Sequence, residues 1–493
     1  MKKLILLFIL IPLTTSLAQQ PGSFDNTFNV GIGPQYLIYS GGDSYLNDAL
    51  IRHSALLPDG KIIVIGQFKY FDGNSTSKIA RLNADGSFDN TFNSSGTGFD
   101  SNLPWNSEAS PYQIFTQPDG KILVSGNFKS YNGIPKRLLI RLNSDGSIDN
   151  SFYFYNTPLY DYSYHNSISD VYVMSDGKIL VAGTFGYYNN SNLTIKNQLL
   201  RLNSDGSLDT TFNIQNSYDG YIADIKLQTD DKILVAGQFD NISNFWYPKI
   251  ARLNSDGTVD TNFIIYAGFN NPVKNIEIAP DGGIFVGGSF TTFDNAPVQH
   301  IVKLLPGGYR DFTFTVGAPE ITTPFGDDRF ILMPNGQLFL FGSFIFNGNW
   351  NYNAGMFNAD GSFDYSFLNV FENYVSGFAQ PDGKIVCYGS FNSYDGHTAK
   401  RIVRINGSSL ATNDFNQIKA TVFPNPSSSE IHLTGFQEGD FIELIVITDM
   451  TGKEIVCRAN MPNKINIENL ASGMYLLQVF SNSIKTTTKF IKN

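Results

Sequence analysis

Short apolar runs that alternate with turn residues make up most of this chain. The first run, Lys61–Phe68, follows the turn Pro58-Asp59-Gly60 and ends in Gly-x-Phe. Short apolar runs bounded by turns predict β-strands that are buried on both faces. The same run returns after turns that begin at Pro118, Ser175, Thr229, Pro280, Pro334 and Pro381. Repetition at a period of roughly 50 to 60 residues indicates a solenoid or a propeller.

A second segment with the pattern Arg-Leu-Asn-x-Asp-Gly follows each run. It spans Arg81–Phe92 in the first unit and returns around Arg141, Arg201, Arg252, Lys303 and Met356. The seventh unit stops after Asn406, and its missing half, Gly22–Phe28, stands near the other end of the chain. A closed ring needs a device that joins its last unit to its first. We therefore predict an all-β fold in which residues 19–407 form a seven-bladed β-propeller, its last blade completed by the N-terminal strand.

Each blade is expected to hold four strands. A variable stretch before the first turn gives the innermost strand, Lys121–Gly126 is typical of the second, Ile79–Asn83 of the third and Ser87–Phe92 of the outermost. Because strands alternate in direction, both Asp-Gly turns of a blade lie on one face of the ring. The loops after Gly-x-Phe and the crossovers between blades are expected on the opposite face. The crossovers are irregular in length, and function usually resides on such variable loops.

Aromatic residues gather in those variable segments. The candidate ligand-binding residues are Trp105, Trp246, Trp350, Tyr153, Tyr155, Tyr160 and Tyr162. Their flat rings with polar edges suit the faces of sugars or a protein partner. The alternative is that they pack at the ends of the innermost strands. Binding predicts that substitution of a tryptophan abolishes ligand capture and leaves the melting temperature unchanged, whereas a structural role predicts the reverse.

One repeated motif resembles part of a calcium site. Asn203–Asp209 is similar to the later half of a calcium-binding loop, in which oxygen ligands converge on the cation. Arg201 stands where the first carboxylate is needed, and its guanidinium would repel a cation and pair with Asp209 instead. We therefore predict an Arg-Asp clamp in each outer hairpin and no cofactor, with calcium left open. A melting temperature that falls in chelator would contradict the clamp.

Composition and charge limit the compartment and the partners. The 493 residues are 14% aromatic and only 16% charged, which fits an all-β protein outside the cytoplasm. Two early lysines and the apolar run Leu4–Leu13 predict a signal peptide over residues 1–18, cleaved between Ala18 and Gln19. With two of its 34 basic residues removed, the mature chain keeps all 44 acidic residues and a net charge of −12. We expect no nucleic-acid partner and no transmembrane segment.

Motifs for catalysis are missing from the sequence. The histidines lack metal-binding spacing, and neither a Gly-x-Ser-x-Gly elbow nor a phosphate-binding Gly-Lys-Ser occurs. Cys387 and Cys457 fall in different predicted domains, so we expect neither a disulfide nor a zinc site. We do not expect an enzyme. A pair of carboxylates that meets at the central channel would nevertheless permit a glycan-active hydrolase or lyase.

A different, smaller domain follows the repeats. Residues 408–419 are predicted to be a linker, and alternating apolar runs over residues 420–493 predict a compact β-sandwich. Its motifs resemble, in order and spacing, the type A C-terminal sorting domain of type IX secretion in Bacteroidetes. They consist of Pro424, Asn425, Pro426, Asp449, Gly452, Gly473 and Tyr475. The resemblance implies export through the periplasm, passage by the type IX machinery and removal of the domain by a surface protease, which leaves the propeller secreted or anchored at the cell surface.

The repeats themselves resemble the delta-60 repeat family over residues 20 to 407, which implies a propeller and no assigned activity. Units five and six depart from the pattern because Lys303 and Met356 replace the arginine, and this weakens the clamp there. Three functions stay open: a non-catalytic binding propeller for a glycan or protein ligand, a structural or adhesive repeat protein, and an extracellular hydrolase or lyase. We expect the first of these, as a monomer.

Overall fold

The computed structural model describes residues 20–40, 43–99, 110–154, 167–189, 192–212, 218–316, 320–321, 330–346, 349–367, 371–407, 421–434, 442–449, 454–459, 464–481 and 484–493. The predicted signal peptide, its cleavage site and the predicted linker lie outside these residues. The chain divides into two compact units, Gln19–Ser408 and Ser409–Asn493. Every regular element of the described residues is a β-strand, which confirms the all-β class. None of these residues belongs to a helix long and apolar enough to cross a membrane.

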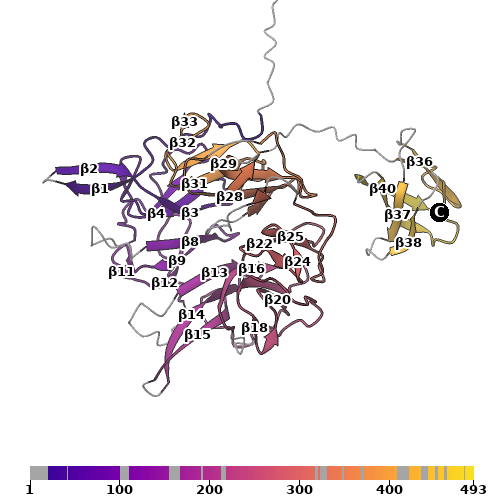
Figure 1. Ribbon diagram of the computed structural model, residues 1–493, viewed down its shortest axis with the longest axis horizontal. Coiled ribbons are helices and arrows are strands. Elements are labelled where there is room, and N and C mark those ends of the chain that lie inside the picture. Colours follow the sequence, from indigo (N-terminus) through magenta and orange to yellow (C-terminus); the bar gives the residue numbers. More distant parts are fainter. Residues whose placement is uncertain are drawn as a thin grey trace, which may run out of the picture. The chain divides into compact units, whose positions relative to one another are not determined.

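Seven sheets follow one another in the described part of Gln19–Ser408, and in each of them the second strand of the unit lies in the middle (Figure 1). In chain order the sheets are β3 (Ile51–Leu56), β4 (Ile62–Gly66) and β7 (Ile79–Leu82); β8 (Ser110–Thr116), β9 (Ile122–Asn127) and β12 (Leu138–Leu142); β13 (Ser167–Val173), β14 (Ile179–Asn189) and β15 (Asn192–Leu202); β16 (Tyr221–Leu227), β17 (Ile233–Gln238) and β20 (Ile250–Leu253); β21 (Val273–Ile278), β22 (Ile284–Gly288) and β25 (Ile301–Leu304); β26 (Glu320–Ile321), β27 (Phe330–Leu332), β28 (Leu338–Phe346) and β29 (Asn349–Phe357); and β30 (Val375–Ala379), β31 (Ile385–Gly389) and β34 (Ile402–Ile405). The predicted second and third strands are therefore confirmed.

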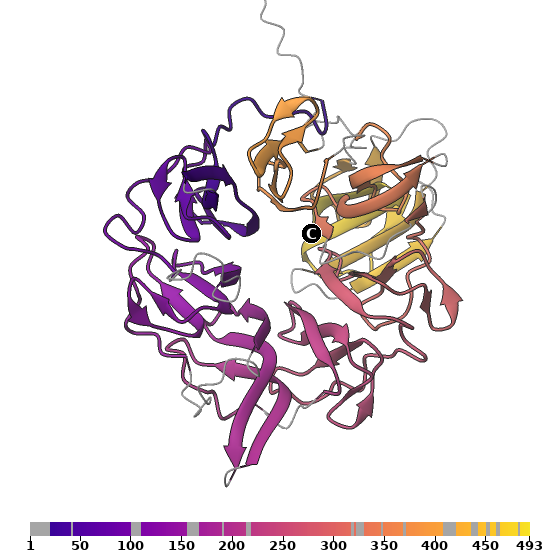
Figure 2. The same cartoon turned by 60° about the vertical axis from the view of Figure 1, so that its left-hand side comes forward.

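The innermost strands contact one another in a closed circle. β3 contacts β8, and the series continues through β13, β16, β21, β27 and β30 back to β3. The sheets thus stand as blades arranged in a ring (Figure 2). This arrangement confirms the β-propeller that the repeats predict.

The core lies between neighbouring blades. All five residues of β4 are buried, as are those of β22 and β31. Ile63 and Ile65 of the first blade pack against Ile114 and Val124 of the second. Because the middle strand is covered on both faces, its sequence is uniformly apolar rather than alternating. Cys387 belongs to this core as a free thiol whose pKa is raised by burial.

The outermost strand is much shorter than predicted, so the expected strand over Ser87–Phe92 is wrong. The chain makes one isolated bridge, Leu82 to Phe88, and then turns. Asp89 Oδ1 accepts hydrogen bonds from the backbone N and the hydroxyl of Thr91, at 3.0 and 2.6 Å. This local bonding competes with continued strand pairing. Corresponding bridges begin at Leu142, Leu202, Leu253, Leu304 and Phe357.

Small hairpins between the second and third strands lie at the periphery of the ring (Figure 1). They are β5 (Tyr70–Phe71) with β6 (Asn74–Ser75), β10 (Ser130–Tyr131) with β11 (Ile134–Pro135), β18 (Asn241–Ile242) with β19 (Phe245–Trp246), β23 (Thr292–Phe293) with β24 (Ala296–Pro297), and β32 (Ser393–Tyr394) with β33 (His397–Thr398). β1 (Pro34–Ser40) and β2 (Asp43–Asp48) extend the first hairpin. The Tyr131 hydroxyl donates to Gly146 O, 2.7 Å away in an Asp-Gly turn. These loops therefore fold along the outer edge of the blades, which corrects their predicted place on one face.

The N-terminal segment completes the last blade, as predicted. Phe24 forms a bridge with Ile405 of β34, and Asp25 N donates to Arg404 O at 3.0 Å. The Nε of Arg404 lies 2.7 Å from Asp25 Oδ2. Arg404 Nη1 also donates to Ala84 O of the first blade, at 2.6 Å. One arginine therefore ties together the two ends of the repeat series.

The predicted Arg-Asp clamp is confirmed in four further blades, where Nε to Oδ2 distances are 2.7 to 2.8 Å. The pairs are Arg81–Asp89, Arg141–Asp149, Arg201–Asp209 and Arg252–Asp260. In the fifth blade Lys303 lies 3.5 Å from Asp311. In the sixth, where Met356 replaces the arginine, Asp364 accepts a hydrogen bond from Gln337 at 3.1 Å. The departures noted in the sequence therefore do weaken the clamp locally.

The calcium-like motif is engaged by protein donors. Asp209 Oδ2 accepts from Lys178 Nζ at 2.7 Å and from Arg201 Nε at 2.8 Å. Asp205 Oδ1 accepts from the backbone N and the hydroxyl of Ser207, at 2.9 and 2.6 Å. Two cations already share the Asp209 carboxylate, so the arrangement favours the clamp over a calcium site.

The described residues of the C-terminal unit form two sheets. They are β35 (Thr421–Phe423), β36 (Glu430–Thr434) and β39 (Lys464–Asn466), and β37 (Ile442–Asp449), β38 (Glu454–Ala459), β40 (Gly473–Ser481) and β41 (Ile484–Lys492). Buried residues of both sheets, including Ile431, Ile447 and Leu477, form one core, as expected of a sandwich.

The sorting motif takes distinct places in this unit. Pro424, Asn425 and Pro426 are exposed, and Asn425 Nδ2 donates to Lys489 O at 3.1 Å. Asp449 ends β37 opposite Tyr475 of β40. Tyr475 is buried, and its hydroxyl donates to Ala471 O at 2.9 Å. Gly473 begins β40, whereas Gly452 lies outside the described residues.

Candidate functional site

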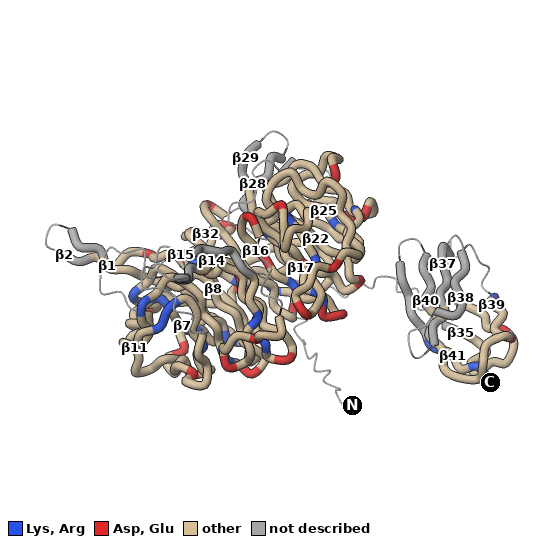
Figure 3. Tube along the Cα trace, turned by 90° about the horizontal axis from the view of Figure 1, so that it is seen from below, with Lys and Arg blue, Asp and Glu red and all other residues tan. Residues whose placement is uncertain are grey.

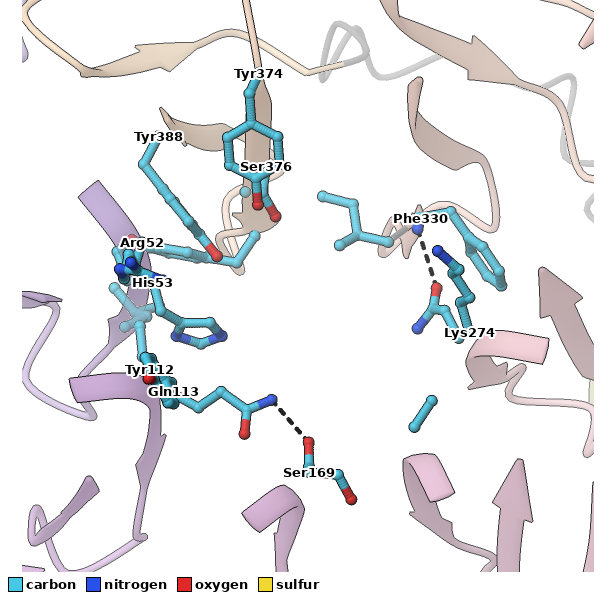
Figure 4. Close-up of a pocket in the computed structure, with 18 of the residues that line it drawn as sticks. Arg52, His53, Tyr112, Gln113, Ser169, Lys274, Phe330, Tyr374, Ser376 and Tyr388 are labelled. Atoms are coloured by element: carbon cyan, nitrogen blue, oxygen red, sulfur yellow. Dashed lines mark hydrogen bonds between the residues drawn. The ribbon is translucent and has the colours of Figure 1, made fainter. Parts of the chain in front are cut away.

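A cavity of about 920 Å³ occupies the central channel of the propeller. Its described lining comes from the innermost strand of every sheet and residues next to it, with Tyr388 of β31. A cavity of this size lies within the range of small-molecule and sugar sites. The channel is therefore the candidate site (Figure 4).

The glycine of Gly-x-Phe lets the innermost strand approach closely. A Cβ on Gly66 would lie 2.1 Å from Leu50 O, and one on Gly126 would lie 2.4 Å from Ser110 O. Both oxygens belong to backbone that cannot move aside without breaking the sheet. The repeat therefore requires glycine at this position for space.

A β-bulge opposite each of these glycines aims one residue at the channel. In the first five blades the pairing shifts by one residue beside the glycine. A bulge redirects its side chain and increases the local twist. The extra residues are Arg52, Tyr112, Ser169, Ala223 and Lys274, and all five line the cavity. Together with Tyr221 and Tyr374 they form what we call the channel mouth, at the strand ends opposite the Asp-Gly turns.

Polar residues just beyond the bulges fix neighbouring blades to one another. Asp170 Oδ2 accepts from Ile225 N at 2.8 Å, and Asp224 Oδ2 accepts from Ile276 N at 2.8 Å. Asn275 Oδ1 accepts from Phe330 N at 3.0 Å. Hydrogen bonds of this kind hold the bulge residues at fixed positions around the channel.

The channel mouth combines tyrosines with cations. Tyr112, Tyr221 and Tyr374 are 38%, 41% and 38% exposed. The Arg52 guanidinium carbon lies 5.4 Å from the centroid of the Tyr112 ring, within the range of a cation–π contact. Figure 4 shows Arg52 and Tyr112 on one side of the cavity and Lys274 on the other. Such a surface offers stacking area and positive charge to a ligand.

Deeper in the channel the charges are paired. Lys226 Nζ lies 3.0 Å from Glu277 Oε1 and 3.9 Å from Asp224 Oδ1. Burial alone would lower the pKa of Lys226, but the carboxylates of Asp224 and Glu277 raise it by more. Glu277 is the only carboxylate among the described residues that line the cavity.

The opposite side of the ring is acidic. Each Asp-Gly turn carries an exposed carboxylate, as at Asp85, Asp145 and Asp205. Acidic positions, drawn in red, recur on turns at strand ends around the propeller (Figure 3). The positive side chains of the channel mouth thus stand out against an acidic molecule.

Two of the aromatic residues predicted from the sequence, Trp246 and Tyr153, are described with their side chains, and neither lines the described cavity. Trp246 lies in β19 at the periphery and is 60% exposed. Tyr153 is 61% exposed, and its backbone N donates to Asp205 O at 2.8 Å. Tyr153 therefore lies beside an Asp-Gly turn, which corrects its predicted place on the opposite face. Their role in binding stays a prediction.

The structure does not describe the side chains of the remaining predicted aromatic residues. Trp105, Tyr155, Tyr160 and Tyr162 lie outside the described residues. The backbone of Trp350 pairs with Ile345 within the β28–β29 hairpin. These positions also stay predictions.

Sequence reasoning missed the residues of the channel mouth, although a signal for them exists. Arg52, Tyr112 and Lys274 each stand six residues before the proline of a Pro-Asp-Gly turn, at Pro58, Pro118 and Pro280. The spacing is constant because the same number of residues separates the bulge from the turn in each of these blades. Because the residues of this stretch differ from unit to unit, they are not part of the repeat pattern and were not predicted from it.

Comparison with known families agrees with the architecture. Six segments match the profile described as a domain of unknown function, DUF5122, beta-propeller, at residues 57–92, 117–152, 175–212, 228–263, 279–314 and 380–409. Residues 421–493 match the secretion system C-terminal sorting domain. Both resemblances inferred from the sequence are confirmed.

Comparisons with individual proteins do not indicate a function. A search of curated protein sequences found no match. PorZ, a surface component of the type-IX secretion system of Porphyromonas gingivalis, is 11% identical, with 94% of this chain and 86% of that chain covered and a TM-score of 0.20. The α-L-arabinanase of Penicillium chrysogenum is 9% identical, with 76% and 97% covered and a TM-score of 0.30. TM-scores this low support no argument about function.

Proposed function

We propose that the propeller is a non-catalytic binding protein whose channel mouth holds a glycan. The chain carries DUF5122 β-propeller repeats and a secretion system C-terminal sorting domain. The sorting domain directs export by type IX secretion to the cell surface or the extracellular space. A mature protein in that location meets polysaccharides and the surfaces of other cells. Removal of the sorting domain by a surface protease is part of this proposal.

One observation carries the proposal: three half-exposed tyrosines, Tyr112, Tyr221 and Tyr374, border a cavity of about 920 Å³. Exposed tyrosine rings pack against the apolar faces of sugars, and their hydroxyls hydrogen-bond to sugar hydroxyls. The polar mouth contrasts with the uniformly apolar middle strands, such as β4 and β22. A purely structural propeller would have no need to display these rings around an open cavity.

Two features favour binding without catalysis. Glu277, the one carboxylate of the described cavity lining, is paired with Lys226 at 3.0 Å. A paired carboxylate is a poor general acid, because the ammonium group stabilises its charged form. The second feature is the packing of His53, the described histidine of the lining, whose ring centroid lies 5.9 Å from that of Tyr388.

The test is a polysaccharide and glycan array probed with the chain from Gln19 to Asn493, with and without chelator. We expect retention on one class of glycan, unchanged by chelator, with no new reducing ends released from it. Blank arrays would contradict glycan binding and favour a structural role. Release of reducing ends would contradict the non-catalytic assignment.

A further inference from the structure

Arg52 is the arginine of the channel mouth, and its surroundings differ from those of the clamp arginines. Each clamp arginine lies 2.7 to 2.8 Å from an aspartate. Among the described residues no acidic side chain pairs with Arg52, and its buried Nε has no hydrogen-bond partner. A buried guanidinium donor without an acceptor costs free energy in the unliganded protein. The Arg52 side chain also lines the cavity, so a ligand held there can reach it.

Aromatic rings flank this guanidinium. The Tyr112 ring lies 5.4 Å from the Arg52 guanidinium carbon, and Tyr374 is 38% exposed at the adjacent edge of the seventh blade. Figure 4 shows Arg52, His53, Tyr112, Tyr374 and Tyr388 arranged along one side of the cavity. A flat ring can therefore stack on tyrosine while a charged substituent reaches Arg52.

Two cationic side chains, Arg52 and Lys274, line the described cavity. Lys226 is neutralised by Glu277 within the channel, and the Asp-Gly turns carry carboxylates at the other end of the strands. An anion is repelled from that end and attracted to the mouth. The described lining thus holds two cationic side chains and one carboxylate, Glu277, and offers positive charge to an anionic ligand.

We infer that the Arg52 edge of the channel mouth is a carboxylate subsite, and that the glycan bound there is an acidic polysaccharide built from uronic acids. The inference rests on the proposed glycan-binding function. The planar guanidinium of Arg52 donates two parallel hydrogen bonds to a sugar carboxylate, a geometry that lysine cannot reproduce. Tyr112 and Tyr374 provide the stacking surfaces for the pyranose rings.

The test compares polygalacturonate with its methyl ester, which keeps the sugar and removes the charge. The chain from Gln19 to Asn493 is titrated with each, and with neutral dextran, dextran sulfate and polyglutamate, by calorimetry. The variant is Arg52→Gln. Its matched control is Arg310→Gln, because Arg310 also lies over an aromatic ring, 5.3 Å from the centroid of Phe312, and is absent from the described cavity lining.

We expect polygalacturonate to bind at least about tenfold more tightly than its methyl ester, and Arg52→Gln to remove that difference. Arg310→Gln should change the affinity by less than about twofold, and all three proteins should melt alike. Equal affinity for the ester, or an Arg52→Gln variant with unchanged affinity, would overturn the carboxylate subsite while leaving glycan binding intact. Equal affinity for dextran sulfate or polyglutamate would overturn uronate recognition in favour of charge alone. Failure to bind any polysaccharide would overturn both proposals.

Discussion

The pair formed by Arg201 and Asp209 shows what a single repeated residue contributes. The two side chains are 9% and 5% exposed, and Asp209 Oδ2 also accepts a hydrogen bond from Lys178 Nζ at 2.7 Å. Removal of one partner from a buried ion pair leaves an uncompensated charge, which typically costs about 3 to 5 kcal/mol. The clamp therefore explains why this hairpin needs an arginine and an aspartate together.

The substitution Asp209→Asn tests the clamp directly. We expect it to lower the free energy of unfolding by about 3 kcal/mol, because the Arg201 guanidinium stays buried without its counter-ion. The matched control is Asp364→Asn, at the same place in the sixth blade, where Met356 replaces arginine. That control should cost less than about 1 kcal/mol. Equal losses in urea unfolding would contradict the role of the arginine.

The clamps also predict how stability depends on pH. Burial raises the pKa of Asp209, but hydrogen bonds from Lys178, Thr211 and Arg201 lower it by more, so that it lies well below its usual range. Asp25, Asp89 and Asp149 behave in the same way. A pKa depressed in the folded state contributes stability above the unfolded value, about 3.9, and that stability is lost as the pH falls. Melting temperature should therefore be steady from about pH 5 to 8 and should fall below about pH 4; an increase on acidification would contradict the account.

Among the structural elements, the bulge beside Gly66 links the repeat to the channel. The carbonyl of Leu50 occupies the space of a Cβ, and Arg52 projects from the bulge that this close approach allows. The Gly-x-Phe pattern is thus a requirement for backbone space, whereas the residue that reaches the cavity is free to vary. In the first five blades the repeat places a bulge at the same position and fills it with a different residue.

The substitution Gly66→Ala should destabilise the propeller by about 2 kcal/mol or more, because the methyl group would lie 2.1 Å from Leu50 O. Gly73→Asn is the control, since nothing lies within 4 Å of a Cβ there and its φ of +75° suits asparagine. The control should cost less than about 1 kcal/mol. Thermal unfolding of both variants measures the difference, and equal melting would contradict the argument from space.

The elements divide into those that sequence predicts and those that it does not. The uniformly apolar runs, such as the one in β4, predict buried middle strands because burial on both faces leaves a clear pattern. The outermost strand escapes prediction because Thr91 bonds to Asp89 locally and ends the pairing. The bulge at Arg52 also escapes, since one extra residue in a variable stretch changes no periodicity.

At the scale of the whole molecule, the ring is closed by the N-terminal segment. Asp25 is fully buried, and its Oδ2 lies 2.7 Å from Arg404 Nε and 2.8 Å from Lys384 Nζ. The split repeat predicts this closure, because the two halves of one unit stand at opposite ends of the series. What the split cannot predict is which side chains the closed ring brings around the channel, since Arg52 and Tyr374 are far apart in the chain.

Deletion of residues 19–28 should lower the melting temperature by about 5 °C or more, because Arg404 and Lys384 would lose their shared counter-ion and β34 its neighbour. Asp25→Asn in the intact chain should give a smaller loss, since the backbone pairing of Phe24 with Ile405 is kept. Scanning calorimetry of the two variants measures both effects. A deletion that melts like the mature chain would show that closure does not depend on this segment.

The most direct test of the account compares ligand capture by Tyr221→Ala, at the channel mouth, with capture by Trp246→Ala, at the periphery. The two rings are 41% and 60% exposed, so neither substitution should alter the melting temperature appreciably. On the polysaccharide that retains the mature chain, we predict at least about tenfold weaker binding for Tyr221→Ala and no change for Trp246→Ala. Loss of capture by Trp246→Ala with normal binding by Tyr221→Ala would place the site on the outer hairpins and contradict the channel mouth as the binding site.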